Sequence, residues 1–236
     1  MRILAIAIIF SAVLAWAISA IPEGAQTAVG RTETRTSPTP GNVTADGGNV
    51  TEVNISISSQ TQVWQGFFGE VNGSIVLEDA SGDLFYTWNV SNVSGEVYAS
   101  RRSNVNFAII LPMNNCSQDN FLTGFSQADS MNETFFPASN SNPFQIGLVL
   151  INASSACSTH PYVSSAPTSG AFEEIVVSDD PNNRSNASSS FNSTTWVGRI
   201  HSNTAGFDGA THDYQLLVPV NRTAGVNVYF FYAELG

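Results

Sequence analysis

The residues of this chain that most clearly invite chemistry are asparagines. The pattern Asn-x-Ser/Thr, with x not proline, is the acceptor for N-linked sugars and occurs thirteen times in 236 residues. With 22 Asn and 48 Ser or Thr in the chain, chance gives roughly four or five such sites. A bulky polar glycan needs a solvent-facing Asn, so this excess predicts a glycan coat over most of the surface. The acceptors are Asn42, Asn49, Asn54, Asn72, Asn89, Asn92, Asn115, Asn132, Asn152, Asn183, Asn186, Asn192 and Asn221.

The alternative is that Asn- and Ser-rich loops produce sequons that are never used. Asn115 is the least favourable acceptor, because the middle residue of its sequon is Cys116. Cys116 and Cys157 are the two cysteines of the chain, and we expect them to form one disulfide that closes a loop of about 40 residues. Two buried thiols are the alternative.

A second set of residues could bind a metal. His201, Asp208, His212 and Asp213 lie close together in sequence, and His and Asp are common metal ligands. Their spacings match no established motif, and neighbouring residues such as His212 and Asp213 point to opposite faces of a strand. We therefore favour a solvated loop and predict no metal site here.

The run Asp179-Asp180-Pro181-Asn182-Asn183 offers oxygen ligands in a turn. It could hold calcium, but no further ligand spacing of an EF-hand type is present. The alternative is a turn that carries the acceptor Asn183.

No catalytic constellation is evident. Glu173 and Glu174 alternate along a predicted strand, so they cannot act together as a paired acid and base. His160 has no recognisable nucleophile setting, and no G-x-S-x-G pattern occurs. We predict that the protein is not an enzyme and requires no cofactor.

Aromatic residues are the remaining candidates for binding, since exposed rings can stack on sugars. Strand alternation makes core packing the default expectation for them. The set is Trp64, Phe67, Phe68, Phe85, Tyr86, Trp88 and Tyr98.

Short strands must position all of these residues, because apolar residues alternate with polar ones over many segments of five to ten residues. Thr51–Ile57 places Val53, Ile55 and Ile57 on one face and predicts a half-buried strand. Asn114–Asn142 is expected to be a long excursion pinned by the disulfide. Two late segments, 212–220 and 226–235, look like a hairpin. The other predicted strands are 63–69, 73–78, 84–90, 96–100, 105–111, 144–151, 172–178 and 195–201.

About ten strands at near-regular spacing, with no helical period between them, predict an all-β fold. We expect an antiparallel two-sheet sandwich, Ig-like or jelly-roll-like, over residues 49–236. Residues 21–48 are rich in Thr, Pro and Gly and predict a flexible stalk, with O-linked sugars as a further option.

Residues 1–20 predict export. Arg2 precedes an unbroken apolar run from Ile3 to Ala17, and small residues follow before Pro22, as in a secretory signal peptide. The alternative is an uncleaved anchor, since Ile3–Ile21 reaches the lower limit for spanning a bilayer. In either case we expect the body at the cell surface, with the membrane touched only through a retained N-terminal segment.

Composition excludes several classes of protein. Only 11% of residues are charged, the net charge is −11, and all eight basic residues are Arg. An acidic surface without Lys is a poor partner for phosphate backbones, so we expect no nucleic acid binding. The lack of Lys also excludes Walker-type phosphate loops and Schiff-base catalysis.

Two stretches carry a resemblance. They are Val63–Arg101 (VWQGFFGEVNGSIVLEDASGDLFYTWNVSNVSGEVYASR) and Phe230–Leu235 (FFYAEL). In them the chain resembles uncharacterised exported β-rich cell-surface glycoproteins of archaea. The resemblance implies a cell-surface setting and no particular activity.

These features predict a secreted, N-glycosylated structural protein that self-associates into an extracellular filament or S-layer-type assembly. Donation of the strand Thr51–Ile57 to the sheet edge of a neighbouring subunit is one route to a polymer. The alternative is an adhesin or carbohydrate-binding module, favoured by the aromatic content. A glycan hydrolase would need paired carboxylates that the sequence does not place.

Overall fold

A computed structural model describes residues 21–90, 93–114, 116, 129–137, 143–152, 156–160, 162–163, 166–167, 172–180, 193–220 and 227–236. Within these ranges the chain forms antiparallel strands and two short helices, η1 (Phe107–Ile109) and α1 (Met131–Thr134), which confirms the all-β prediction. Neither helix is long and apolar enough to cross a membrane. The predicted signal segment, residues 1–20, lies outside the described ranges.

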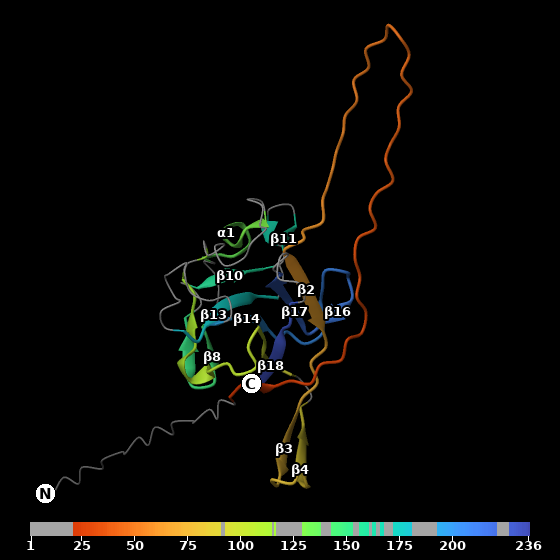
Figure 1. Ribbon diagram of the computed structural model, residues 1–236. Coiled ribbons are helices and arrows are strands. Elements are labelled where there is room, and N and C mark those ends of the chain that lie inside the picture. The colour runs from red at the N-terminus through yellow and green to blue at the C-terminus, as the bar shows by residue number, and fades with distance from the viewer. Residues whose placement is uncertain are drawn as a thin grey trace, which may run out of the picture.

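One antiparallel sheet of eight strands forms the centre of the molecule (Figure 1). Its order is β1-β18-β5-β14-β13-β10-β7, and β6 also pairs with β13. The bounds are β1 (Glu23–Gly24), β5 (Gly95–Ser100), β6 (Leu111–Pro112), β7 (Phe136–Pro137), β10 (Cys157–Thr159), β13 (Glu174–Ser178), β14 (Thr194–Arg199) and β18 (Phe230–Leu235).

The three middle strands of this sheet are buried on both faces. All five residues of β13 are buried, as are nearly all residues of β5 and β14. Successive side chains of a strand point to opposite faces, so these strands supply two separate apolar cores. The first core includes Tyr98, Ile175 and Val197, and the second includes Ala99, Val176 and Trp196.

Different elements cover the two faces. The first core is closed by η1 and by a hairpin of β8 (Phe144–Ile146) and β9 (Val149–Ile151). The second core is closed in part by a separate sheet of only two strands, β2 (Trp64–Gly69) and β17 (Tyr214–Pro219). A sheet of only two strands therefore stands where we predicted the second sheet of a sandwich.

Three predictions of local structure in the body of the molecule were wrong. Residues 144–151 form the β8–β9 hairpin and not one central strand, because Gly147 adopts a φ of 56° that favours a glycine turn. Residues 105–111 form η1 and the start of β6. The segments at 212–220 and 226–235 are not a hairpin, since β17 pairs with β2 while β18 pairs with β5 and β1.

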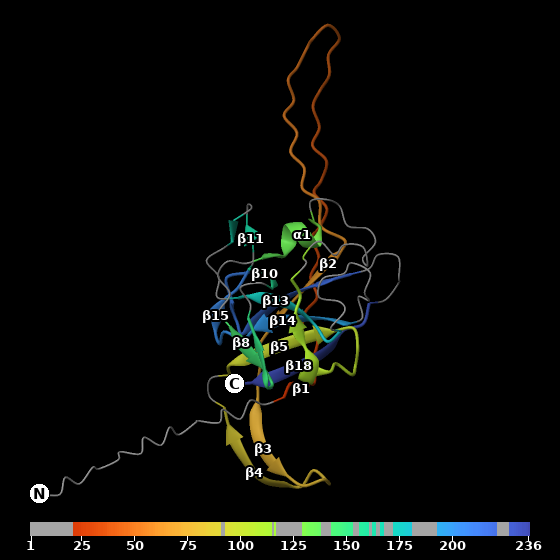
Figure 2. The same ribbon diagram turned by 90° about the vertical axis from the view of Figure 1, so that its left-hand side faces the viewer.

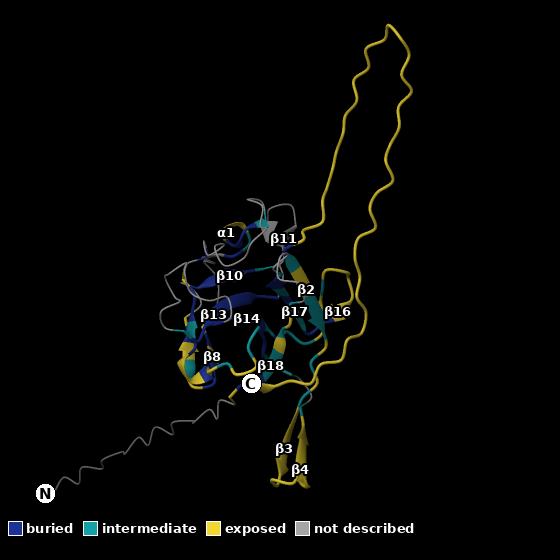
Figure 3. Cartoon of the chain, in the orientation of Figure 1, coloured by how far each residue is buried: buried dark blue, intermediate teal, exposed yellow. Residues whose placement is uncertain are grey.

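Residues 26–62 form a long two-limbed arm that leaves the body after β1 and returns to β2 (Figure 1). Near its base the limbs are joined by Thr34 Oγ1 donating to Gln60 Oε1 (3.2 Å) and by an Arg35 guanidinium donating to the Ser58 carbonyl (2.8 Å). The segment Thr51–Ile57 lies on this arm, makes no strand and is exposed at every position (Figure 3). The prediction of a half-buried strand at residues 51–57 was wrong for the isolated chain.

A second projection is the hairpin of β3 (Ser74–Glu78) and β4 (Leu84–Asn89). Figures 1 and 2 show it pointing away from the body on the side opposite the arm. All residues of both strands are exposed. The remaining pairs are small: β11 (Tyr162–Val163) with β12 (Ala166–Pro167), and β15 (Thr204–Ala205) with β16 (Thr211–His212).

The predicted disulfide is confirmed. Cys116 and Cys157 are bonded, and both are buried in the second core with α1 residue Met131 and with Phe135. Much of the predicted excursion at 114–142 lies outside the described ranges. The bond connects that segment to β10 of the main sheet.

Two buried carboxyl groups face each other at the end of the first core. Glu96 of β5 is directly opposite Glu234 of β18. Glu234 accepts hydrogen bonds from the Tyr98 hydroxyl (2.9 Å) and from the Gly147 amide (3.0 and 3.1 Å). Glu96 has the Arg199 guanidinium at 3.9 Å. Burial, opposed by Arg199 and reinforced by Glu234, raises the pKa of Glu96 to about 7.

This pair predicts a fold that is more stable in acid. The folded state keeps a proton on Glu96 that the unfolded chain releases above its ordinary pKa of 4.5. The free energy of unfolding should be greatest below that pH and fall by on the order of 3 kcal/mol as the pH rises to about 7. Denaturant unfolding at pH 4, 6 and 8 measures this decline, and Glu96→Gln should flatten it. An equal decline in the variant would contradict the assignment.

Candidate functional site

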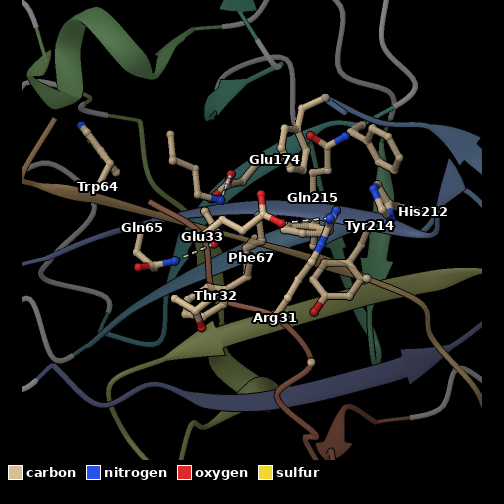
Figure 4. Close-up of a pocket in the computed structure, with 18 of the residues that line it drawn as sticks. Arg31, Thr32, Glu33, Trp64, Gln65, Phe67, Glu174, His212, Tyr214 and Gln215 are labelled. Carbon is tan, nitrogen blue, oxygen red and sulfur yellow. Dashed lines mark hydrogen bonds and ion pairs between the residues drawn. The ribbon is translucent and has the colours of Figure 1, made fainter. Parts of the chain in front are cut away.

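A groove of about 1040 Å³ opens beside the two-stranded layer of β2 and β17 (Figure 4). Residues 64–70, which comprise β2 and the residue after it, line the groove, as do residues 214–217 of β17. The arm base, Thr27–Glu33, also lines it. The apolar part comes from rings of the second core, where Phe67 contacts Phe231 with ring centroids 5.2 Å apart.

The outer edge of β2 borders this groove. The Val220 amide donates to the Val63 carbonyl at 2.7 Å. This bond and the register show which residues of β2 direct their backbone groups toward β17. Antiparallel pairing then turns the amides and carbonyls of alternate β2 residues, such as Gly66 and Phe68, away from β17. No strand within the described ranges pairs with this edge. An open strand edge is a template for another strand.

Glu174 lies on the β13 side of the groove. It is 4% exposed, and its Oε2 accepts the Leu217 amide of β17 at 2.7 Å. Its Oε1 is buried and has no hydrogen-bond partner among the described residues. Burial, opposed by the Leu217 bond, raises the pKa of this carboxyl well above its ordinary value. Sequence reasoning missed this role, although a carboxylate inside an otherwise apolar buried strand was a usable signal.

Arg31 attaches the arm base to the body. Its guanidinium contacts an Asp208 carboxylate oxygen at 2.6 Å and lies over the Phe68 ring, 5.4 Å from the centroid. The other Asp208 oxygen is 2.9 Å from His212 Nε2. These contacts lower the pKa of Asp208, with the His212 hydrogen bond as the largest cause. The arm base is thereby held beside β2 by charged and aromatic contacts (Figure 4).

The four proposed metal ligands have other partners. Both Asp213 carboxylate oxygens accept backbone amides, from Val71 (2.9 Å) and Asn203 (2.8 Å), and Asp213 is buried and not in a solvated loop. His201 packs edge-on against the Phe172 ring, and burial lowers its pKa. The side chains of Asp208 and His212 contact each other, whereas His201 contacts Asp213 through the backbone, its amide donating to the Asp213 carbonyl at 2.8 Å. The described ranges contain no cluster of three or more His, Cys, Asp or Glu able to hold a metal.

The acidic turn after β13 is also occupied in part. The Asp179 carboxylate pairs with the Arg102 guanidinium and accepts the Asn106 amide at 2.9 Å. A cationic side chain therefore stands where calcium was considered. The Asp180 amide donates to Ser178 Oγ at 3.1 Å, and the rest of the turn, including Asn183, lies outside the described ranges.

The remaining titratable candidates are separated. Glu173 pairs with Arg199 at 3.4 Å, whereas Glu174 bonds to β17, so the two carboxylates do not face a common point. His160 Nδ1 lies 3.2 Å from the Phe172 carbonyl.

The aromatic set divides into two groups. Core packing is confirmed for Tyr98, Trp64 and Phe67, and Phe68 packs against Phe207 and His212. It is wrong for the three rings of β4, because the β3–β4 hairpin leaves the body. Their exposed fractions are 83% for Phe85, 53% for Tyr86 and 47% for Trp88.

The sequons lie where glycans could be attached. The acceptors within the described ranges are all exposed: Asn42, Asn49, Asn54, Asn72, Asn89, Asn132 and Asn152. The other six, Asn92, Asn115, Asn183, Asn186, Asn192 and Asn221, lie outside those ranges.

We expect Arg31→Ala to free the arm base without destabilising the fold. An exposed ion pair contributes only about 0–1 kcal/mol, so the unfolding temperature should stay within a degree or two. Elastase cleavage at Ala28 and Val29 should accelerate several-fold, as followed by mass spectrometry. Arg35→Ala is the matched control, since Arg35 joins the two limbs and not the arm to the body. Equal cleavage of the Arg31 variant and the native chain would show that this contact does not hold the arm.

Comparison of the chain with models of protein families, with curated proteins and with solved structures finds no match. The function proposed below is therefore argued from the geometry of the arm, the groove and the sequons.

Proposed function

We propose that this chain is a secreted, N-glycosylated structural subunit of an extracellular polymer at the cell surface. Its subunits are joined when the arm segment Thr51–Ile57 of one copy adds as a strand to the outer edge of β2 in the next copy. The observation that carries the proposal is the alternating apolar segment Thr51–Ile57, which pairs with no described strand, on a chain that also has a partly apolar groove beside an edge of β2 with which no described strand pairs.

The donor segment has the pattern of a half-buried strand. Val53, Ile55 and Ile57 alternate with polar residues and are 49%, 86% and 89% exposed. Fully burying one such side chain contributes about 1.5–3 kcal/mol, so three of them favour a covered state. The segment has seven residues and β2 has six, so the lengths of donor and acceptor match. Strand addition supplies main-chain hydrogen bonds, and groove pockets receive alternate side chains.

The sequons are compatible with this insertion. Asn54 alternates with Val53 and Ile55, so in a strand its side chain points away from the face that would be buried. A glycan on Asn54 would remain in solvent while the apolar face enters the groove. Asn42 and Asn49 lie elsewhere on the exposed arm.

The course of the chain favours donation to another copy over closure onto the chain's own β2. Thr61 Oγ1 donates to an Asp129 carboxylate oxygen (2.8 Å), and the Trp64 indole donates to the Asp129 carbonyl (2.8 Å). Together with the Arg35 bond to Ser58, these contacts fix both ends of residues 58–64. The arm then leads away from the groove of its own chain (Figure 1).

The second candidate is an adhesin or sugar-binding module. It is favoured by the exposed rings of Phe85, Tyr86 and Trp88, because exposed aromatic rings can stack on sugars. In that function the outer edge of β2 and the arm segment Thr51–Ile57 have no role.

We expect the purified native protein to form polymers, and charges on the apolar face of the arm strand to abolish them. Val53→Asp with Ile57→Asp would bury two charges in the groove and should leave a folded monomer. Both changes spare the sequon at Asn54. Negative-stain electron microscopy and size-exclusion chromatography measure the outcome.

Ser58→Asp is the control, since it adds an acidic side chain outside the apolar face and should polymerise like the native chain. Deletion of residues 49–58 should also give monomers. Unchanged polymers in the deletion variant would overturn the proposal, and so would a native protein that remains monomeric.

A further inference from the structure

The β3–β4 hairpin has one apolar face and one mixed face that carries both polar and apolar residues. The register places Ile75 opposite Trp88, Leu77 opposite Tyr86, and Ser74 opposite Asn89. Side chains of paired residues share a face, so one face collects large apolar groups. We call this the hairpin apolar face; it consists of Ile75, Leu77, Tyr86 and Trp88, and it ends where the register shifts between Leu77 and Glu78.

The apolar face is open in the isolated chain. Its four side chains are 47–56% exposed, and the Tyr86 and Trp88 rings contact each other with centroids 4.7 Å apart. Together they form a patch on the order of 500 Å², a size at which exposed apolar surface usually marks an interaction site. A two-stranded hairpin alone is at best marginally stable in water, so a covering partner would also stabilise it.

The opposite face carries the sequon. Asn89 lies there with Ser74, Val76, Phe85 and Thr87. A glycan on Asn89 would block contact through this face and leave the apolar face bare. The hairpin is therefore built to dock on one side only.

We propose that the hairpin apolar face docks onto a second copy of this chain and extends the contact made by the donated strand. This inference rests on the proposed strand donation. The hairpin follows β2 along the chain after only four residues, Glu70–Gly73, so it lies next to the acceptor edge. It also points away from the body on the side opposite the arm (Figures 1 and 2).

The opposite positions of the arm and the hairpin indicate that a second copy of the chain covers the hairpin apolar face. In a head-to-tail chain the arm of one copy approaches the acceptor edge of the next, so the hairpin of the acceptor faces the donor copy. A patch of this size falls short of the roughly 800 Å² per partner of a standard interface. It is suited to enlarge an existing contact between copies and not to bind a separate protein alone.

The test compares two faces of one hairpin in the full glycosylated chain. Tyr86→Thr with Trp88→Thr removes the rings of the apolar face, and Phe85→Thr removes a more exposed ring from the opposite face. The apolar-face variant should raise the critical concentration for polymerisation about tenfold or more, whereas Phe85→Thr should match the native chain. Unfolding temperatures check that both variants fold. Acrylamide quenching of Trp88 fluorescence, assigned with Trp88→Phe, should fall when the native monomer polymerises.

Each outcome bears on one proposal. If the native chain polymerises while both hairpin variants match it and Trp88 remains quenchable, the docking proposal is overturned and strand donation stands. If Val53→Asp with Ile57→Asp polymerises like the native chain, strand donation itself fails. If the apolar-face variant polymerises normally but loses binding on a glycan array, the face belongs to a carbohydrate site and docking is overturned.

Discussion

The need to cover a central sheet on both faces governs the rest of this structure. Strands β5, β13 and β14 send apolar side chains to both sides, so each side requires a covering layer. The β8–β9 hairpin and η1 close one side. On the other side β2 and β17 are the only described sheet that covers the core, together with non-strand residues such as Met131 and Phe135. This small sheet ends at an edge of β2 with which no described strand pairs. The groove beside β2 follows from this short second layer.

The small size of the second layer also explains the arm and the β3–β4 hairpin. A strand edge that lacks a neighbour and a strand-like segment that lacks a sheet are complementary, and this chain has both. Because the arm and the β3–β4 hairpin extend on opposite sides of the body, the proposed contact between the arm segment of one copy and β2 of the next would be directional. A directional, heterologous contact produces an open chain of subunits and not a closed pair.

This surface has few charged residues to keep it soluble. Glycans at the sequons would supply polar groups in their place. Asn54 lies opposite the apolar residues of the arm strand, and Asn89 lies opposite the apolar face of the hairpin. Sugars at these positions would shield the faces that remain in solvent and leave the contact faces bare. The raised pKa of Glu96 adds a contribution to stability that is largest at low pH.

Local patterns predicted much of the fold and little of the site. Alternation placed β4, β13 and β14 closely, and the two cysteines could pair only with each other. Alternation could not reveal which strands are partners, so the prediction that β17 pairs with β18 was wrong, although only ten residues separate the two strands in sequence. The apolar run at 144–151 hides a turn at Gly147, because period alone does not distinguish one buried strand from a buried hairpin. The role of Glu174 depends on the Leu217 amide, which comes from a distant strand that packs across β14.

Isotope-mixed cross-linking tests strand donation most directly. A photoreactive residue replaces Ile55, and equal amounts of ¹⁴N- and ¹⁵N-labelled chains are mixed, polymerised and illuminated. The account predicts cross-links between residue 55 of one isotope and peptides spanning residues 64–69 of the other. Cross-links to residues 64–69 that join only peptides of the same isotope would show that the arm closes on its own chain. That result would contradict the account.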